Sequence, residues 1–203
     1  MAHIQSAKII KLVVICILAS LANIFLSVFF RSFLGFPLFL DTVFTAAVTF
    51  AFGLIPGIAV AALSLLIPCI YYKSINFFIL CSIAEVLLIH TLKPAPMNIP
   101  DFAPKEKIIA YYTSIAAKLM FLYIICAITI SVLGGVIDYV SQVFLGKHYF
   151  SVEDNFKLSL IMNNLPILAV NILSRIPVNI VDRFIVIFGG YFISRGLVKI
   201  KLV

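Results

Sequence analysis

The chain has 203 residues, of which 64% are hydrophobic and only 11% are charged, and its mean hydropathy is +1.20. Soluble domains carry about 25% charged residues, so this composition indicates a polytopic membrane protein and excludes a separate soluble catalytic domain. The net charge of +7 does not indicate nucleic-acid binding, because the cations are spread over the ends of apolar segments, as is usual in membrane proteins.

The apolar runs, taken in chain order, predict an all-α protein with a single domain of six membrane-spanning helices. A run of about 20 apolar residues is long enough to cross the hydrocarbon core. We expect spans at about 9–30, 38–52, 56–72, 75–92, 108–138 and 177–197. Gly53, Pro56 and Gly57 allow a tight turn between the second and third spans. Pro68 is expected to kink the third span, and the proline-rich stretch KPAPMNIPDFAPKEK forms an extramembrane linker after the fourth.

The last apolar stretch is too long for a single span. It runs from Leu158 to Ile193, after the polar segment GKHYFSVEDNFK. Pro177 lacks a backbone donor and tends to begin a helix, so we expect the last span to start there and residues 146–176 to form an outer loop or re-entrant segment. The alternative is a seven-span protein in which the first part of this stretch also crosses the membrane.

The distribution of cations predicts the orientation of the six spans, which place both termini on one side. Eight cations lie on the terminal side, namely Lys8, Lys11, Lys93, Lys105, Lys107, Arg195, Lys199 and Lys201. Four lie on the other side, namely Arg31, Lys73, Lys147 and Lys157. Because cytoplasmic flanks carry the excess of Lys and Arg, both termini are expected in the cytoplasm.

Polar residues interrupt the last apolar stretch at helical spacing. Steps of four, four and three place Asn171, Arg175, Asn179 and Asp182 on one face, provided that the helix is continuous. An ionisable group in hydrocarbon costs about 2.5–3.5 kcal/mol on insertion scales, so such groups face a polar cavity or a partner. Arg183 follows directly and belongs to the same group.

The predicted topology brings further charges to the outer half of the membrane. Asp41 begins the second span and Asp138 ends the fifth, at the depth where the last span starts. The candidate substrate-binding residues are therefore Asp41, Asp138, Asn171, Arg175, Asn179, Asp182 and Arg183. They form either a structural ion-pair cluster or a small-molecule pocket open to the outside, whose arginines favour an anionic or carbonyl-rich ligand.

Two ion pairs are predicted from depth and spacing. Arg175 is expected to contact Asp182 if the chain folds back at Pro177, and otherwise to contact Asp41 or Asp138. Glu85 and Lys118 are each about 15 Å from the end of their own span, so we expect them to pair at mid-membrane.

The sequence indicates no enzyme, cofactor or metal site. The four cysteines lie in apolar runs without ligand-like spacing, and the three histidines are scattered, with no HExxH motif. A Ser–His or Asp–Asp pair on facing helices would be the alternative.

Two stretches resemble S components of energy-coupling factor transporters, FPLFLDTVFTAAVTFAFGLIPGIAVAAL and RIPVNIVDRFIVIFGGYFI. Asp41 matches the outer polar position of the second span in that family, and the polar residues from Arg175 to Arg183 match the outer part of its last helix. The resemblance implies a multi-pass protein of a prokaryotic cytoplasmic membrane that captures a vitamin or related micronutrient at high affinity for uptake.

The resemblance also implies partners, a scaffold membrane subunit and two ATPases. The chain itself has no Walker motif, so ATP hydrolysis would belong to other chains. The family's Ala-x-x-x-Ala pattern is replaced in CILASLANIFLS by Cys16 and Ser20, which we expect to contact a partner or, alternatively, another helix of the same chain. A solitary transporter and a ligand-sensing module with a signalling partner are the alternative functions.

Overall fold

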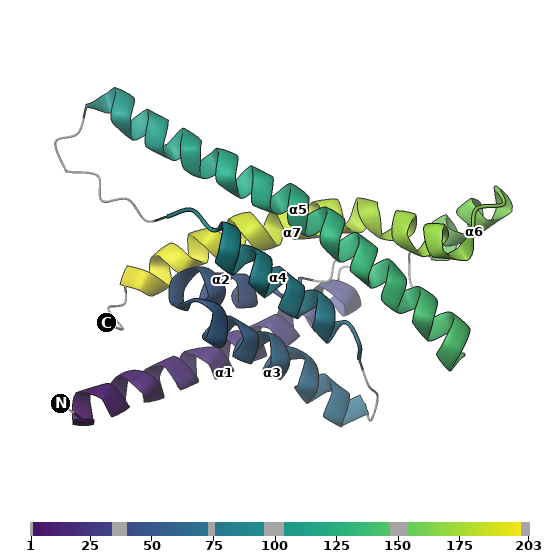
Figure 1. Cartoon of the computed structure of the whole chain (residues 1–203). Coiled ribbons are helices and arrows are strands. Elements are labelled where there is room, and N and C mark those ends of the chain that lie inside the picture. Colours follow the sequence, from purple (N-terminus) through teal and green to yellow (C-terminus); the bar gives the residue numbers. More distant parts are fainter. Residues whose placement is uncertain (1, 34–39, 73–75, 96–103, 147–153, 200–203) are drawn as a thin grey trace.

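The structure is a computed structural model that describes residues 2–33, 40–72, 76–95, 104–146 and 154–199. Throughout these ranges all regular secondary structure is helical (Figure 1), which confirms the predicted all-α class. The helices are α1 (Ala2–Phe33), α2 (Val43–Phe52), α3 (Leu54–Tyr72), α4 (Ile79–Leu92), α5 (Lys105–Leu145), α6 (Asp154–Met162) and α7 (Ile167–Lys199).

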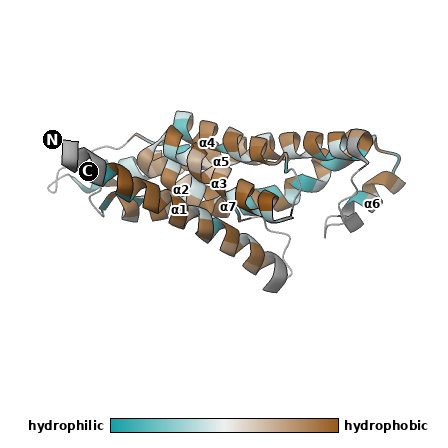
Figure 2. Cartoon of the chain, turned by 90° about the horizontal axis from the view of Figure 1, so that it is seen from below, coloured by the Kyte–Doolittle hydropathy of each residue, from teal (hydrophilic) through white to brown (hydrophobic). Residues whose placement is uncertain are grey.

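Four of the described helices, α1, α3, α5 and α7, are long and apolar enough to cross a membrane. The apolar helices α2 and α4 have 10 and 14 residues, and at 1.5 Å per residue they are about 15 and 21 Å long, shorter than a hydrocarbon core of about 30 Å. Figure 2 shows apolar residues along most of the bundle. The protein is therefore a multi-pass membrane protein.

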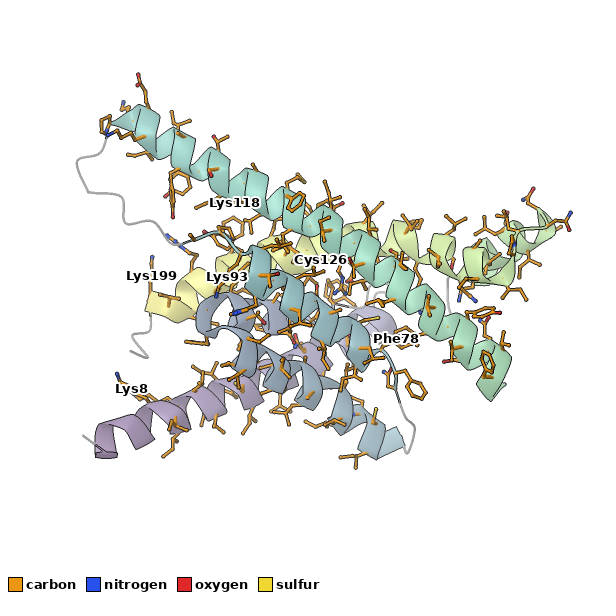
Figure 3. The ribbon with its side chains drawn as sticks, in the orientation of Figure 1. Lys8, Phe78, Lys93, Lys118, Cys126 and Lys199 are labelled. Carbon is orange, nitrogen blue, oxygen red and sulfur yellow. The ribbon has the colours of Figure 1, made fainter. Side chains whose placement is uncertain are left out.

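The chain runs back and forth along the bundle and returns to where it began. Figure 1 shows both termini at one end, which we call the terminal end, and α6 with the start of α7 at the opposite, distal end. Lys8, Lys93 and Lys199 lie toward the terminal end, whereas Phe78 lies on the distal side (Figure 3).

Glycines allow α7 to approach both α5 and α2 closely. A Cβ atom on Gly135 of α5 would lie 2.7 Å from the Cα atom and 2.8 Å from the backbone nitrogen of Ile172. A Cβ atom on Gly190 of α7 would lie 2.8 Å from the Cβ atom of Ala46 in α2. Real Cβ atoms do not approach other atoms so closely, so the helix crossings require glycine at both positions.

The last helix does not begin where the sequence predicted. Pro177 lies inside α7, which starts at Ile167 and continues without a break to Lys199. The expectation of a span beginning at Pro177 is therefore wrong, and the last ten residues of the predicted outer segment belong to the helix. Proline leaves the carbonyl of Leu173 without its usual helical donor, which membrane helices tolerate when their neighbours hold them in place.

The small-residue stripe of α1 is an internal packing surface. Cys16 and Ala19 are buried together with Val48 and Val60, and the hydroxyl oxygen of Ser20 lies 3.4 Å from the carbonyl oxygen of Val60. The stripe therefore packs against α2 and α3, so the expectation that it contacts a partner is wrong and the alternative, packing within the chain, holds.

The Gly135→Ala variant tests the crossing of α5 and α7. The added methyl group meets the backbone of Ile172, so we expect a loss of about 1–3 kcal/mol of stability, as for other overpacked sites. Thermal unfolding of the purified protein in detergent measures this loss. The matched control is Gly196→Ala in α7, where an added Cβ atom has no neighbour within 4 Å. Equal melting temperatures for the two variants would contradict the close crossing.

Candidate functional site

The continuous α7 presents a row of polar side chains to α5. The Asn171 side chain donates to the Oε1 atom of Gln142 (3.0 Å), and the Asn179 side chain donates to the hydroxyl of Ser131 (3.0 Å). Between them, the Arg175 Nε atom donates to Asp138 (2.9 Å). The residue numbers of the α5 partners decrease as the residue numbers on α7 increase, because the two helices run antiparallel.

The Asp138 cluster consists of Asp138, Arg175 and Lys157. The Oδ2 atom of Asp138 lies 2.8 Å from the Nη2 atom of Arg175 and 3.3 Å from the Nζ atom of Lys157. The side chains of Arg175 and Lys157 retain 11% and 10% exposure, and the guanidinium carbon of Arg175 lies 4.6 Å from the centre of the Phe78 ring. Two cations and one carboxylate give this cluster an excess positive charge.

Gly134 makes room for this arrangement. A Cβ atom at Gly134 would lie 3.0 Å from the Nη1 atom and 3.2 Å from the Cδ atom of Arg175. The Arg175 side chain therefore packs directly against the α5 backbone at Gly134 and reaches Asp138, which lies one helical turn further along α5.

The Arg183 cluster consists of Arg183, Glu85, Asp182 and Thr42. The Nη1 atom of Arg183 donates to the Oε2 atom of Glu85 (2.6 Å) on α4 and to the hydroxyl of Thr42 (3.0 Å), which precedes α2. The Nε atom donates to the Oδ2 atom of Asp182 (3.2 Å), and the Nη2 atom contacts the same oxygen. One guanidinium thus joins α2, α4 and α7.

The Arg183 cluster is closed to water and contains an excess of acceptors. Glu85 and Asp182 are fully buried, and Arg183 and Thr42 are each 4% exposed. The Oε1 atom of Glu85 and the Oδ1 atom of Asp182 have no hydrogen-bond partner among the described residues. Asp41 is half-buried next to this cluster and interacts electrostatically with its charged side chains.

The seven candidate residues therefore divide between two places. Asn171, Asn179 and the Asp138 cluster lie along the contact of α5 with α7, whereas Asp41 and Asp182 belong with Arg183. The predicted contact of Arg175 with Asp182 is absent, because an unbroken helix holds them two turns apart. The stated alternative, Asp138, is the partner of Arg175.

The predicted pair of Glu85 with Lys118 is wrong. Lys118 is exposed on α5 (Figure 3), and Glu85 binds Arg183 instead. From the sequence, Arg183 was expected at the mouth of the last span and was not considered as the partner of Glu85.

A third polar group involves Asn23, which the sequence analysis did not single out. The Nδ2 atom of this fully buried asparagine donates to the hydroxyls of Thr45 (2.9 Å) and Ser64 (3.2 Å). Its Oδ1 atom accepts from the backbone N–H of Phe44 (2.9 Å), one of the unpaired donors at the start of α2. Asn23 therefore caps α2 from a neighbouring helix and has a structural role.

A cavity of about 250 Å³ lies between α5 and α7 but is separate from both charged clusters. Its walls are aliphatic apart from Ser131 and Tyr123, and Ile128 and Ile180 are 57% and 45% exposed. The cavity therefore opens toward the outside of the bundle, which in a membrane is the lipid side.

Comparisons of the chain with protein-family models, with curated proteins and with solved structures give no match. Within the described ranges, no group of three His, Cys, Asp or Glu side chains is placed to hold a metal ion.

Replacing Arg183 by methionine tests the ion pairs of the Arg183 cluster. Arg183→Met leaves Glu85 and Asp182 buried without their cationic partner, so we expect a loss of about 3–5 kcal/mol of stability. The matched control is Lys118→Met, which removes an exposed cation and should change stability by less than about 0.5 kcal/mol. Melting curves in detergent compare the variants.

The double variant Arg183→Met with Glu85→Gln should recover part of the loss, because the amide needs no counter-ion. Strictly additive effects of the two substitutions would show that Arg183 and Glu85 do not interact.

Proposed function

We propose that the protein captures a small molecule of micronutrient size at its distal end, for uptake across the membrane, as an S component of a transporter of the energy-coupling factor type. The observation that carries this proposal is the Asp138 cluster. Among the described side chains, two cations, one carboxylate and an aromatic ring meet there from different helices, and the cations keep about a tenth of their side-chain surface exposed.

The charge of the Asp138 cluster defines the chemistry of the ligand. Asp138 neutralises one of its two cations, and the remaining positive charge sits where few water molecules reach it. A carboxylate, phosphate or carbonyl oxygen of a ligand would receive charge-assisted hydrogen bonds from Arg175 and Lys157. Phe78 offers an apolar face beside them. We therefore infer an anionic or carbonyl-rich ligand.

The topology supports capture from outside the cell. In this proposal α1, α2, α3, α4, α5 and α7 make six passes of alternating direction, two of them short, and both termini lie on one face. The terminal end carries Lys8, Lys93 and Lys199 (Figure 3), and cations mark the cytoplasmic face of membrane proteins. In this orientation, in the cytoplasmic membrane of a prokaryote, the distal end faces outward.

Release to the cytoplasm would require partner chains, a scaffold membrane subunit and two ATPases. Because the small-residue stripe of α1 packs inside the chain, a scaffold would use a different surface. The opposite face of α1 is apolar and exposed and includes Val13, Ile17 and Leu21. We propose it as the surface that lies against lipid in the free protein and against the scaffold in the complex.

Native mass spectrometry of the gently purified full chain tests ligand capture. We expect a bound small molecule on the wild-type protein. Arg175→Gln should weaken its binding by about 10- to 100-fold, the loss of roughly 1.5–3 kcal/mol for a hydrogen bond to a charged group. Arg175→Lys, which keeps the charge, should retain more of the ligand.

Lys118→Met serves as the control for this experiment, because it removes a cation far from the Asp138 cluster and should bind like the wild type. Wild-type affinity in a folded Arg175→Gln protein would exclude the Asp138 cluster as the binding site.

A further inference from the structure

The two charged clusters on α7 have opposite charge imbalances. The Asp138 cluster has two cations for one carboxylate, whereas the Arg183 cluster has two carboxylates, Glu85 and Asp182, for one guanidinium. If both carboxylates are ionised, the Arg183 cluster carries one uncompensated negative charge. The imbalance matters more here than at the Asp138 cluster, because Glu85 and Asp182 are both fully buried.

An uncompensated charge in a protein interior costs several kcal/mol, so such a group is normally neutralised. A metal ion does not provide this, since the described residues contain no group of three metal ligands. Among the described residues a further cationic side chain does not provide it either, because Arg183 is the cation in contact with both carboxylates and the Asp138 cluster uses Arg175 and Lys157. The cavity of about 250 Å³ lies elsewhere.

The unpartnered oxygens indicate where the missing charge belongs. One oxygen of each carboxylate is held by Arg183, and the other, Oε1 of Glu85 or Oδ1 of Asp182, is buried and has no hydrogen-bond partner in the part of the chain that the structure describes. A proton is small enough to bind in a closed site, and on either oxygen it makes the cluster electrically neutral. We propose that the Arg183 cluster is a proton-binding site that holds one exchangeable proton on Glu85 or Asp182.

The surroundings of the cluster favour this neutral form. Asp41, next to α2, is a further carboxylate near the cluster. Its repulsion disfavours the state in which Glu85 and Asp182 are both ionised. From α4 and α5 the ionisable neighbours are the thiols of Cys81 and Cys126, both buried in apolar surroundings. Arg175, about two turns before Arg183 on α7, interacts electrostatically with Cys81, but its guanidinium is bound to Asp138. None of these groups supplies the missing positive charge.

Proton exchange at this site would change the contacts of three helices together. With the proton bound, Arg183 faces one carboxylate and one neutral carboxyl group, and the cluster is balanced. When the proton leaves, the same guanidinium must compensate the negative charges of both Glu85 on α4 and Asp182 on α7. Its third partner, the hydroxyl of Thr42 before α2, is neutral. The protonation state therefore couples the packing of α2, α4 and α7.

Infrared spectroscopy of the purified full chain tests the proposal without any ligand. At neutral pH we expect the carbonyl stretch of one protonated carboxylic acid per chain, with the shift in D₂O that marks an exchangeable proton. The chain has only eight Asp and Glu residues, so assignment by substitution is practical. Either Glu85→Gln or Asp182→Asn should remove the band, and Asp138→Asn, in the other cluster, should leave it unchanged.

The pH dependence of stability gives a second measurement on the same proteins. A proton held in the folded state makes stability fall as pH rises, so the wild-type melting temperature should drop as the pH is raised above about 5, where free carboxyl groups are already ionised. Glu85→Gln should flatten this dependence if Glu85 holds the proton.

Absence of the band from the wild-type protein at neutral pH would overturn the proposal, even if no variant folds. Loss of the band in Asp41→Asn, with the band retained in both Glu85→Gln and Asp182→Asn, would overturn it as well, because the proton would then lie outside the Arg183 cluster. Neither result bears on ligand capture at the Asp138 cluster, so the two proposals fail independently.

Discussion

The burial of one guanidinium organises this helix bundle. Arg183 lies where water does not reach, and desolvation of its charge is tolerable only because carboxylates on two helices and a hydroxyl beside a third receive its donors. Two of those partners, Thr42 and Glu85, are far from Arg183 in sequence, so the cluster ties distant parts of the chain together. It fixes the rotation of α7 about its axis and, through the helical period, the positions of Arg175 and Asn179 against α5.

Close backbone contact makes that arrangement geometrically accessible. Gly135 brings α7 against α5, and Gly190 brings it against α2, so polar side chains only a few bonds long reach across from one helix to the next. In a bilayer the burial of apolar surface does not drive helices together, because lipid is as apolar as leucine, and tight packing with interhelical hydrogen bonds does so instead. The pairs Asn179–Ser131 and Asn171–Gln142 provide such bonds.

The sequence was sufficient to predict the all-helical class and the polar face of the last helix, and Asp138 was one of the two alternatives given for the partner of Arg175. It was insufficient where a local preference competed with tertiary contacts. Proline tends to begin a helix, but packing against α5 keeps α7 continuous through Pro177, and the unbroken helix holds Arg175 and Asp182 two turns apart. Asn23 was overlooked for a related reason, since an uncharged residue in an apolar run gives no sign of the helix end that it caps.

The length of α5 exceeds what one membrane crossing needs. Lys118 and Asp138 are 20 residues apart on this helix, which corresponds to about 30 Å, the thickness of a hydrocarbon core. The residues between them carry no charge, so this part of α5 alone is long and apolar enough for a crossing. The first turns of α5, from Lys105 to Lys118, add about 20 Å of helix on the terminal side. A movement of α5 about its glycine crossing would be amplified at the tip of this long helix, far from the crossing itself.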